Sequence, residues 1–297
     1  MIAPIVLFVF ARPDHTQRTI NSLAANLLAK ESDLIIYADA ARNEVDLVNV
    51  NAVRGLIQTI KGFRSITIIE RKSNYGLSKN IIEGVTEVCD RYGKAIVVED
   101  DIVTSPYFLS YMNEALDKYK DAPDVWHISG WNYPLNVENI GSSFFCRVMN
   151  CWGWAVWADR WKYFNKNPKE LISTWNKSKI DQFNLNGTND FWQQVVKNHA
   201  GTLDTWAIFW YATIFEYEGL CLYPCQSFVW NIGNDGSGQN CTKNDLYSID
   251  VLAERIPEFP EVYEESQIAL QGIKLFYNNL PNLYGRKIVR WIRKIFY

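Results

Sequence analysis

Short apolar runs alternate with longer segments of helical periodicity along the first part of the chain. The apolar runs have strand length and are rich in β-branched residues, whereas the longer segments repeat apolar residues at every third or fourth position. Strands are predicted at residues 5–10, 34–37, 66–69 and 95–98, and helices at residues 20–28, 45–60 and 81–92, the last of them ended by Gly93. This alternation predicts an α/β protein with a mostly parallel, doubly wound central sheet that carries helices on both faces.

Three consecutive carboxylates follow the predicted strand at residues 95–98. They are Glu99, Asp100 and Asp101, and the next helix is expected to open at Ser105-Pro106, with Ser105 as its N-cap. In an open α/β sheet, ligands bind at the carboxyl ends of the strands. The acidic triplet is therefore a candidate site.

Charge repulsion within this triplet would raise the pKa of one carboxyl group unless a cation is present. Mg²⁺ and Mn²⁺ prefer carboxylate oxygens and often share them with substrate phosphates. A metal–diphosphate site is the functional interpretation, and a solvated acidic turn is the structural alternative. Because the triplet follows a buried strand, the metal site is favoured over the solvated turn.

Beyond residue 125 the pattern changes, although no repeat or obvious linker interrupts the chain. Strands are expected at residues 125–129 and 219–224, with weak alternation at 143–149, a Trp-dense patch at 151–161, an aromatic helical run at 203–218 and a polar loop at 231–238. We expect residues 131–250 to pack on residues 1–130. A C-terminal helical region is expected at residues 251–297.

Composition excludes several classes of function. The 297 residues are 48% hydrophobic, and a net charge of −3 gives no sign of nucleic-acid binding. The 6 Cys lack paired metal-ligand spacing and are expected to be reduced thiols of a cytoplasmic protein, and 3 scattered His do not predict a His-based metal site. No GxGxxG, P-loop or GxSxG motif occurs, so dinucleotide, ATPase and serine-hydrolase functions lack their main support.

Further candidate residues each have a structural alternative. Arg12 follows the first strand, where it could meet a diphosphate or form a surface ion pair. Asp39 follows the second strand and could contact a nucleotide or cap a helix. Asp204 is a candidate general base or a capping residue. The Trp-rich segment 152–161 is typical of a core, but Gly153 within it indicates close backbone approach near a pocket.

The run Val-Val-Glu-Asp-Asp at residues 97–101, with Ser-Pro-Tyr-Phe-Leu after it, resembles the metal motif of GT-A fold glycosyltransferases. The similarity is nearest to the N-acetylglucosaminyltransferase I type and related bacterial polysaccharide glycosyltransferases. It covers roughly residues 4–242, and it extends in the same order to Arg12, Asp39, 74–80, 124–132, 152–154, 203–206 and 231–238.

This resemblance implies a Rossmann-like GT-A fold and a role for each matching residue. The metal, Mn²⁺ or Mg²⁺, would be bound by Asp101 with support from Asp100. The remaining implied roles are donor binding by Arg12, Asp39, Asn74, Asn80, Glu99 and Asp100, acceptor binding by Trp131, Trp152, Gly153, Trp154 and Trp206, and general-base catalysis by Asp204. Residues 1–130 would then bind the donor, and residues 131–250 the acceptor.

Two positions depart from the pattern of the family. Related bacterial enzymes carry a His where this chain has Asn240, which predicts a weaker metal or diphosphate contact there. The animal enzymes carry a His where this chain has Asn80, so the donor contact at this position is expected to differ.

We therefore expect a metal-dependent, inverting hexosyltransferase of surface polysaccharide biosynthesis. It would use a nucleotide-sugar donor, with a UDP-sugar favoured, and a glycan or lipid-linked acceptor. The alternatives are a non-catalytic glycan-binding protein and a sugar-nucleotide pyrophosphorylase. Residues 284–297 form a basic amphipathic pattern, which predicts contact with the inner face of the cytoplasmic membrane or a helix docked on the domain.

Overall fold

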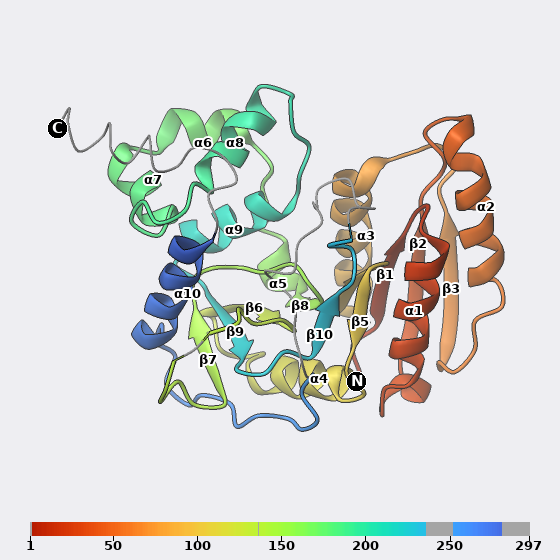
Figure 1. The fold of residues 1–297 in the computed structure, drawn as a ribbon, viewed down its shortest axis with the longest axis horizontal. Coiled ribbons are helices and arrows are strands. Elements are labelled where there is room, and N and C mark those ends of the chain that lie inside the picture. Colours follow the sequence, from red (N-terminus) through yellow and green to blue (C-terminus); the bar gives the residue numbers. More distant parts are fainter. Residues whose placement is uncertain (1, 136, 236–251, 281–297) are drawn as a thin grey trace.

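The computed structural model describes residues 2–135, 137–235 and 252–280 (Figure 1). The strands are β1 Ile5–Val9, β2 Asp33–Ala38, β3 Ser65–Glu70, β4 Lys94–Glu99, β5 Ile102–Thr104, β6 Val125–Ser129, β7 Ser143–Cys146, β8 Trp154–Trp157, β9 Leu220–Pro224 and β10 Val229–Asn231. The helices are α1 Pro13–Ala24, η1 Ala29–Glu31, α2 Glu44–Ile57, α3 Gly76–Tyr92, α4 Phe108–Lys118, α5 Ala158–Trp161, α6 Pro168–Thr174, α7 Lys177–Phe183, α8 Trp192–His199, α9 Ala207–Glu216 and α10 Gln267–Asn279.

Eight strands form one mixed sheet in the order β3-β2-β1-β4-β8-β6-β9-β7. Strands β3, β2, β1 and β4 pair in parallel. Strands β6 and β9 are parallel to each other and run the same way, because β8 is antiparallel to both β4 and β6. Only β8 and β7 run in the opposite direction within this described sheet. The predicted α/β class with a mostly parallel sheet is confirmed, and it is consistent with a Rossmann-like GT-A fold.

The strand order creates a switch point between β1 and β4. The chain moves outward from β1 to β2 and β3, and then returns past β1 to form β4. Right-handed crossovers in opposite directions place α1 and α2 on one face of the sheet and α3 on the other. Figure 1 shows α1 and α2 beside one another along β1 to β3. A crevice at the carboxyl ends of β1 and β4 is therefore expected.

Burial explains why β1 and β4 are continuous apolar runs in the sequence. All five residues of β1 are buried, and so are the four central residues of β4, as expected for strands covered on both faces. The edge strand β3 instead alternates between exposed and half-buried residues. Helix α3 ends as predicted at Gly93, whose φ of 77° lies in the left-handed region and whose N–H donates to the Cys89 carbonyl at 2.8 Å.

The predicted helix start at Ser105-Pro106 is wrong, because α4 begins at Phe108 and has no side-chain cap. The preceding residues form β5, which pairs antiparallel with β10 in a separate two-stranded sheet. The Ser105 hydroxyl donates to the Ala253 carbonyl and accepts a bond from Tyr107 N–H at 3.1 Å. Ser105 therefore joins the end of β5 to a distant segment instead of capping the helix.

The second half of the chain adds elements that sequence periodicity did not reveal. The Trp-rich patch contains β8, which inserts antiparallel between β4 and β6. Helices α6, α7 and α8 are short, and Figure 1 shows them together at one end of the molecule. Strand β8 thereby joins the second half of the chain to β4 of the first half.

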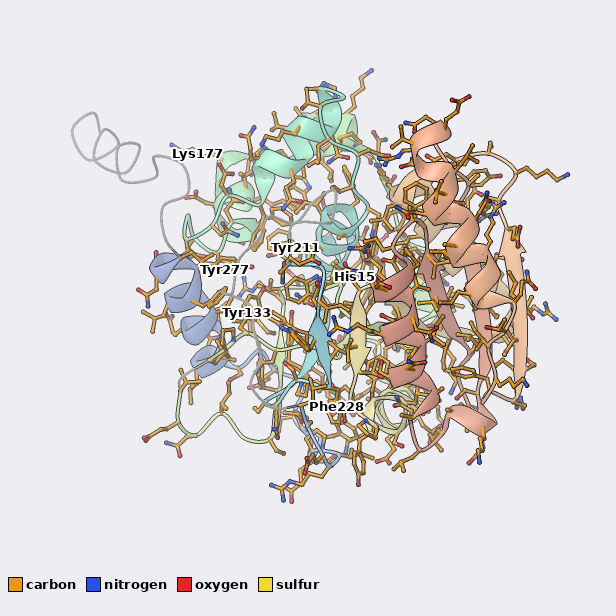
Figure 2. The ribbon with its side chains drawn as sticks, turned by 45° about the vertical axis from the view of Figure 1, so that its right-hand side comes forward. His15, Tyr133, Lys177, Tyr211, Phe228 and Tyr277 are labelled. Carbon is orange, nitrogen blue, oxygen red and sulfur yellow. The ribbon has the colours of Figure 1, made fainter. Side chains whose placement is uncertain are left out.

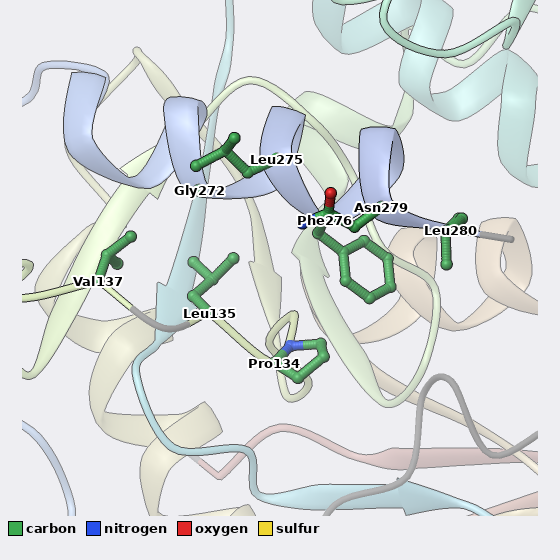
Figure 3. Close-up of a pocket in the computed structure, with 8 residues that line it drawn as sticks. All are labelled: Pro134, Leu135, Val137, Gly272, Leu275, Phe276, Asn279 and Leu280. Atoms are coloured by element: carbon green, nitrogen blue, oxygen red, sulfur yellow. The ribbon is translucent and has the colours of Figure 1, made fainter.

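Helix α10 closes the described part of the chain against β7 and the loop after β6. The Tyr277 and Tyr133 hydroxyl oxygens lie 3.0 Å apart, and the two residues appear close together in Figure 2. Beside this contact, α10 lies with Pro134, Leu135 and Val137 around a largely apolar cleft of about 430 Å³, which Leu275 and Phe276 also line (Figure 3).

Two expectations concern residues outside the described ranges, namely Asn240 and the amphipathic segment 284–297. Within the described ranges, no helix has the length and apolar character needed to cross a membrane.

A buried histidine should make the stability of the fold depend on pH. His127 in β6 is fully buried; its Nε2 lies 2.9 Å from the Asn150 carbonyl oxygen, and its Nδ1 accepts a bond from Trp210 Nε1 at 3.3 Å. Burial lowers the pKa of His127 to about 3, so the folded state keeps the imidazole neutral at a pH where the unfolded chain binds a proton. This contribution to the free energy of unfolding is complete above about pH 6.5 and is lost as pH falls toward 3.

Between about pH 6.5 and 3, we expect His127 to lower the free energy of unfolding by roughly 1.4 kcal/mol for each unit by which the pH falls. Urea unfolding of the wild type and of His127→Gln between pH 4 and 7 measures it, and the variant should have the shallower pH dependence. His199→Gln is the control, because His199 is exposed at the end of α8 and should leave the slope unchanged. Equal slopes for wild type and His127→Gln would contradict the assignment.

Candidate active site

The acidic triplet lies at the switch point of the sheet. Strands β1 and β4 are parallel neighbours, and Phe8 is the register partner of Glu99. The residues that follow the two strands therefore meet at the same edge, Arg12 from β1 and Asp100 and Asp101 from β4. Asp100 and Asp101 are both buried, with 4% and 7% of their surface exposed.

Arg12 forms ion pairs with both aspartates. Its Nη2 donates to Asp101 Oδ2 at 2.9 Å and to Asp100 Oδ1. Burial lowers the pKa of Arg12, but the attraction of Asp100 and Asp101 more than offsets it, so the pKa is raised overall. The guanidinium is thus firmly charged, and it links the first strand to the acidic triplet.

The site nevertheless keeps an excess of negative charge, since one guanidinium faces three carboxyl groups. Burial, followed by the charges of Asp101 and Asp100, raises the pKa of Glu99 to about 8. Burial likewise raises the pKa of Asp100, although Arg12 opposes this. Near neutral pH, Glu99 would therefore hold a proton, which reduces its repulsion by Asp100 and Asp101. An additional cation would reduce the same repulsion, so the site favours one.

The loop after β10 covers this site closely. Ile232 N–H donates to the Asp101 carbonyl at 2.9 Å, and Asp235 Oδ2 lies 3.1 Å from Nε2 of His15 in α1. A methyl group added at Gly233 would lie 2.2 Å from Asp101 Oδ2 and 3.0 Å from Arg12 Nη1. Glycine is therefore required by the contact between this loop and Asp101. Figure 2 shows His15 beside β5, within the same region.

The residues present fit a divalent cation that shares its ligands with a substrate. Within the described ranges, no group of three or more His, Cys, Asp or Glu side chains is arranged to hold a metal ion. However, Mg²⁺ in phosphate-binding sites is commonly held by one or two carboxylates together with phosphate oxygens and water. Asp100 Oδ2 is buried and has no hydrogen-bond partner among the described residues, so a carboxylate oxygen remains for such an ion.

Asp39 sits at the carboxyl end of β2, as the sequence predicted, but its carboxylate is already hydrogen-bonded. Oδ1 accepts from Ala40 N–H and Tyr75 N–H, both at 2.9 Å. Oδ2 accepts from Gly76 N–H at 2.9 Å and from Asn74 Nδ2 at 3.1 Å. Asp39 therefore anchors the start of α3, and direct contact with a nucleotide by Asp39 stays a prediction that would require exchange of these bonds.

Asn80 supports a cationic and aromatic cluster beside this turn. Its Oδ1 accepts a bond from Arg71 Nε at 2.9 Å. The Arg71 guanidinium lies 4.4 Å from the ring centre of Tyr75 and 5.0 Å from that of Tyr37. In this arrangement Asn80 positions Arg71, and donor binding by Asn80 itself remains untested.

The aromatic residues predicted to bind the acceptor lie mainly in the core. Trp131 and Trp154 are fully buried, and Trp206 is 3% exposed and stacks on Trp154 with 5.1 Å between ring centres. Trp152 is half-buried and meets Trp131 edge-to-face. Trp131, Trp154 and Trp206 are thus core residues, and acceptor contact by any of the four remains a prediction.

Gly153 allows the close backbone approach that the sequence predicted, but against core residues. Its φ is 57°, and an added Cβ would lie 2.8 Å from Val229 Cγ1 and 3.3 Å from the Phe108 ring. Its carbonyl also accepts a bond from Gly130 N–H at 2.7 Å. The requirement for glycine is explained by this packing.

Asp204 lies in an exposed position just before α9, and its side chain is 69% exposed. Lys166 Nζ forms an ion pair with Asp204 and also donates to the Ser78 hydroxyl at 2.8 Å. Ser78 belongs to the first turn of α3, which follows the loop held by Asp39. Lys166 therefore links Asp204 of the second half to the start of α3 in the first half.

Sequence reasoning missed Gly233, His15 and Lys166. Gly233 was included only as part of a flexible loop, and its contact with Asp101 depends on the pairing of β10 with β5. Lys166 gave no signal, because a single lysine in a polar segment is normally solvated. His15 lies three residues after Arg12, at the start of α1, and this spacing could have indicated that His15 lies near the same edge of the sheet.

No protein-family model matches the sequence. Among solved structures, the chain is similar to the crystal structure of S. aureus TarS, with 8% sequence identity and a TM-score of 0.38. The match covers 78% of this chain and 37% of that chain, so the chain spans just over a third of the length of TarS. At this level of similarity, function has to be inferred from the site itself.

The contact at Gly233 predicts an unusual cost for a small substitution. We expect Gly233→Ala to lower the free energy of unfolding by about 1–3 kcal/mol, because the new methyl group would overlap the buried Asp101 carboxylate. Gly55→Ala in α2 is the matched control: an added Cβ meets nothing within 4 Å, so it should stabilise by about 0.5–1 kcal/mol. Urea unfolding of both variants measures the difference, and similar effects at the two positions would contradict the described contact.

Proposed function

We propose that the protein is a metal-dependent glycosyltransferase that moves a sugar from a nucleotide-diphosphate donor to a glycan or lipid-linked acceptor. The observation that carries the proposal is the pairing of Arg12 with Asp100 and Asp101 at the switch point between β1 and β4. It combines a fixed cation with carboxylates at the edge of the sheet where ligands bind. A diphosphate joined to a divalent cation matches both kinds of group.

Asp101, with Asp100, would hold Mn²⁺ or Mg²⁺. Such an ion, when bound, would neutralise the charge that develops on the departing diphosphate. Arg12 keeps the two carboxylates oriented, and its Nη1 has no hydrogen-bond partner among the described residues, so it is available to a phosphate oxygen. A UDP-sugar is the favoured donor, on the resemblance of residues 97–101 to the metal motif of GT-A enzymes.

The general base in this proposal is Asp204. An inverting displacement requires a base on the side of the sugar opposite to the leaving diphosphate. Asp204 belongs to the second half of the chain and is mostly exposed, while the acidic triplet belongs to the first half. Lys166 would fix the direction of the carboxylate through its bonds to Asp204 and Ser78.

The alternatives predict different behaviour. A non-catalytic glycan-binding protein would bind sugar without nucleotide or metal. A sugar-nucleotide pyrophosphorylase would use a glycine-rich basic loop after the first strand, whereas this chain has Ala11-Arg12-Pro13-Asp14. We place the transferase in surface polysaccharide synthesis at the inner face of the cytoplasmic membrane, on the basic amphipathic pattern of residues 284–297.

Removal of the Asp101 carboxylate should weaken metal-dependent donor binding. We expect Asp101→Asn, which keeps the shape of the side chain, to weaken Mn²⁺-dependent UDP binding at least about tenfold, or about 1.4 kcal/mol. Calorimetric titration with UDP, with and without Mn²⁺, measures this. Asp117→Asn is the control, because Asp117 is exposed on α4 with 77% of its side chain accessible. Undiminished Mn²⁺-dependent binding by Asp101→Asn would rule out its assigned role.

Loss of the proposed base should reduce turnover but not donor binding. Asp204→Asn keeps the size of the side chain but cannot accept the acceptor's proton, so we expect turnover to fall by about 10²–10⁴-fold. Asp190→Asn serves as the control, because Asp190 also lies in the second half, where its Oδ1 accepts a bond from Gln193 N–H. Normal turnover by Asp204→Asn, or a product that retains the anomeric configuration of the donor, would contradict the mechanism.

A further inference from the structure

A second cleft lies in the second half of the chain, away from the acidic triplet. It has a volume of about 440 Å³ and lies between α9 and residues 163–174, which include α6. This volume is within the range of small-molecule binding sites. The proposed donor site does not use this cleft.

Two exposed tyrosines form an aromatic wall in the cleft. Tyr163 is 41% exposed and Tyr217 is 52% exposed, and their ring centres are 4.8 Å apart. Behind them, the buried Trp126 stacks on Tyr217 with ring centres 4.9 Å apart at an angle of 23°. The tyrosine rings are therefore held in place while accessible to a ligand. An aromatic face carries partial negative charge and attracts the positive C–H groups on the face of a sugar ring.

Two carboxylates in the cleft are held by neighbouring donors. Glu170 Oε2 accepts bonds from Asn165 Nδ2 at 3.1 Å and from Asn167 Nδ2 at 3.0 Å. Glu216 accepts from Trp175 Nε1 and forms an ion pair with Lys179. Held carboxylates that still face solvent are suitable acceptors for sugar hydroxyl groups. Thr174 adds a hydroxyl group to the same lining.

The charge of the lining selects among glycans. The described residues that line the cleft include Glu170 and Glu216, and they include no Lys or Arg. A phosphate, sulfate or uronate would meet repulsion from Glu170, which is bonded to the neutral amide groups of Asn165 and Asn167, whereas Lys179 offsets the charge of Glu216. An uncharged oligosaccharide would not meet this repulsion.

Two segments of the chain connect the cleft with Asp204. The segment that carries Tyr163 and Asn165 into the cleft continues to Lys166, which is paired with Asp204. Helix α9 begins three residues after Asp204 and carries Glu216 at its end, so the two places are about 15 Å apart along the helix. A short oligosaccharide can span this separation.

We propose that this cleft is a binding subsite for an uncharged glycan, stacked on Tyr163 and Tyr217 and hydrogen-bonded to Glu170 and Glu216. The identification of that glycan as the acceptor rests on the proposed function. Its reactive end would lie at Asp204, and its more distant sugars would occupy the cleft.

The test is binding to an array of immobilised neutral and anionic oligosaccharides, without nucleotide or metal. We expect the wild type to bind neutral glycans, and Tyr163→Ala and Tyr217→Ala each to weaken binding about tenfold. Tyr163→Phe and Tyr217→Phe, which keep the rings, should retain binding. Tyr263→Ala is the matched control, since Tyr263 is 42% exposed and does not line the cleft. Binding to no neutral glycan, a preference for anionic glycans, or equal binding by the Ala variants would overturn the proposal.

The same variants separate this proposal from the transferase. Asp101→Asn should bind glycans normally, because the metal site is not part of the cleft. If the tyrosine variants lose glycan binding but the wild type shows no metal-dependent donor binding, the glycan subsite is supported and the transferase function is contradicted. If metal-dependent transfer occurs and the Ala variants keep the acceptor KM of the wild type, only the proposed glycan subsite is contradicted.

Discussion

Arg12 joins two parts of the chain that are far apart in sequence, and the arrangement of the site depends on this contact. It follows β1, and it pairs with two aspartates that follow β4. The pairing is possible because the chain returns past β1 to form β4, which makes the two strands parallel neighbours. The hydroxyl of Thr19 in α1 adds a 2.9 Å bond to the Asp100 carbonyl, so helix, strand and acidic triplet are held together.

The buried charges impose a constraint on every residue around them. A carboxylate removed from water needs a partner, and Arg12 alone cannot compensate three acidic groups. The raised pKa of Glu99 and the unpartnered Oδ2 of Asp100 within the described residues both follow from this imbalance. The loop at Gly233 adds backbone contact without a side chain, which keeps the charges buried. A site organised in this way is suited to a cation and a polyanionic substrate together.

Sequence patterns predicted the first half of the fold well, because β1 and β4 are buried on both faces and are therefore continuous apolar runs. They placed Asp39 and the triplet correctly at strand ends. They did not reveal β8, because its antiparallel insertion between β4 and β6 depends on pairings between distant segments. Likewise, hydrogen bonds from Tyr75 and Gly76 decide what Asp39 does, and no local pattern predicts them.

The central claim is that the acidic triplet and Arg12 bind a metal ion together with a nucleotide diphosphate. The most direct test is a crystal structure grown with UDP and Mn²⁺, in which anomalous scattering locates the manganese. The account predicts a manganese peak within coordination distance of the Asp101 carboxylate, with the diphosphate of UDP bound to the same ion. A nucleotide bound elsewhere, or bound at this edge of the sheet with no manganese beside Asp101, would contradict it.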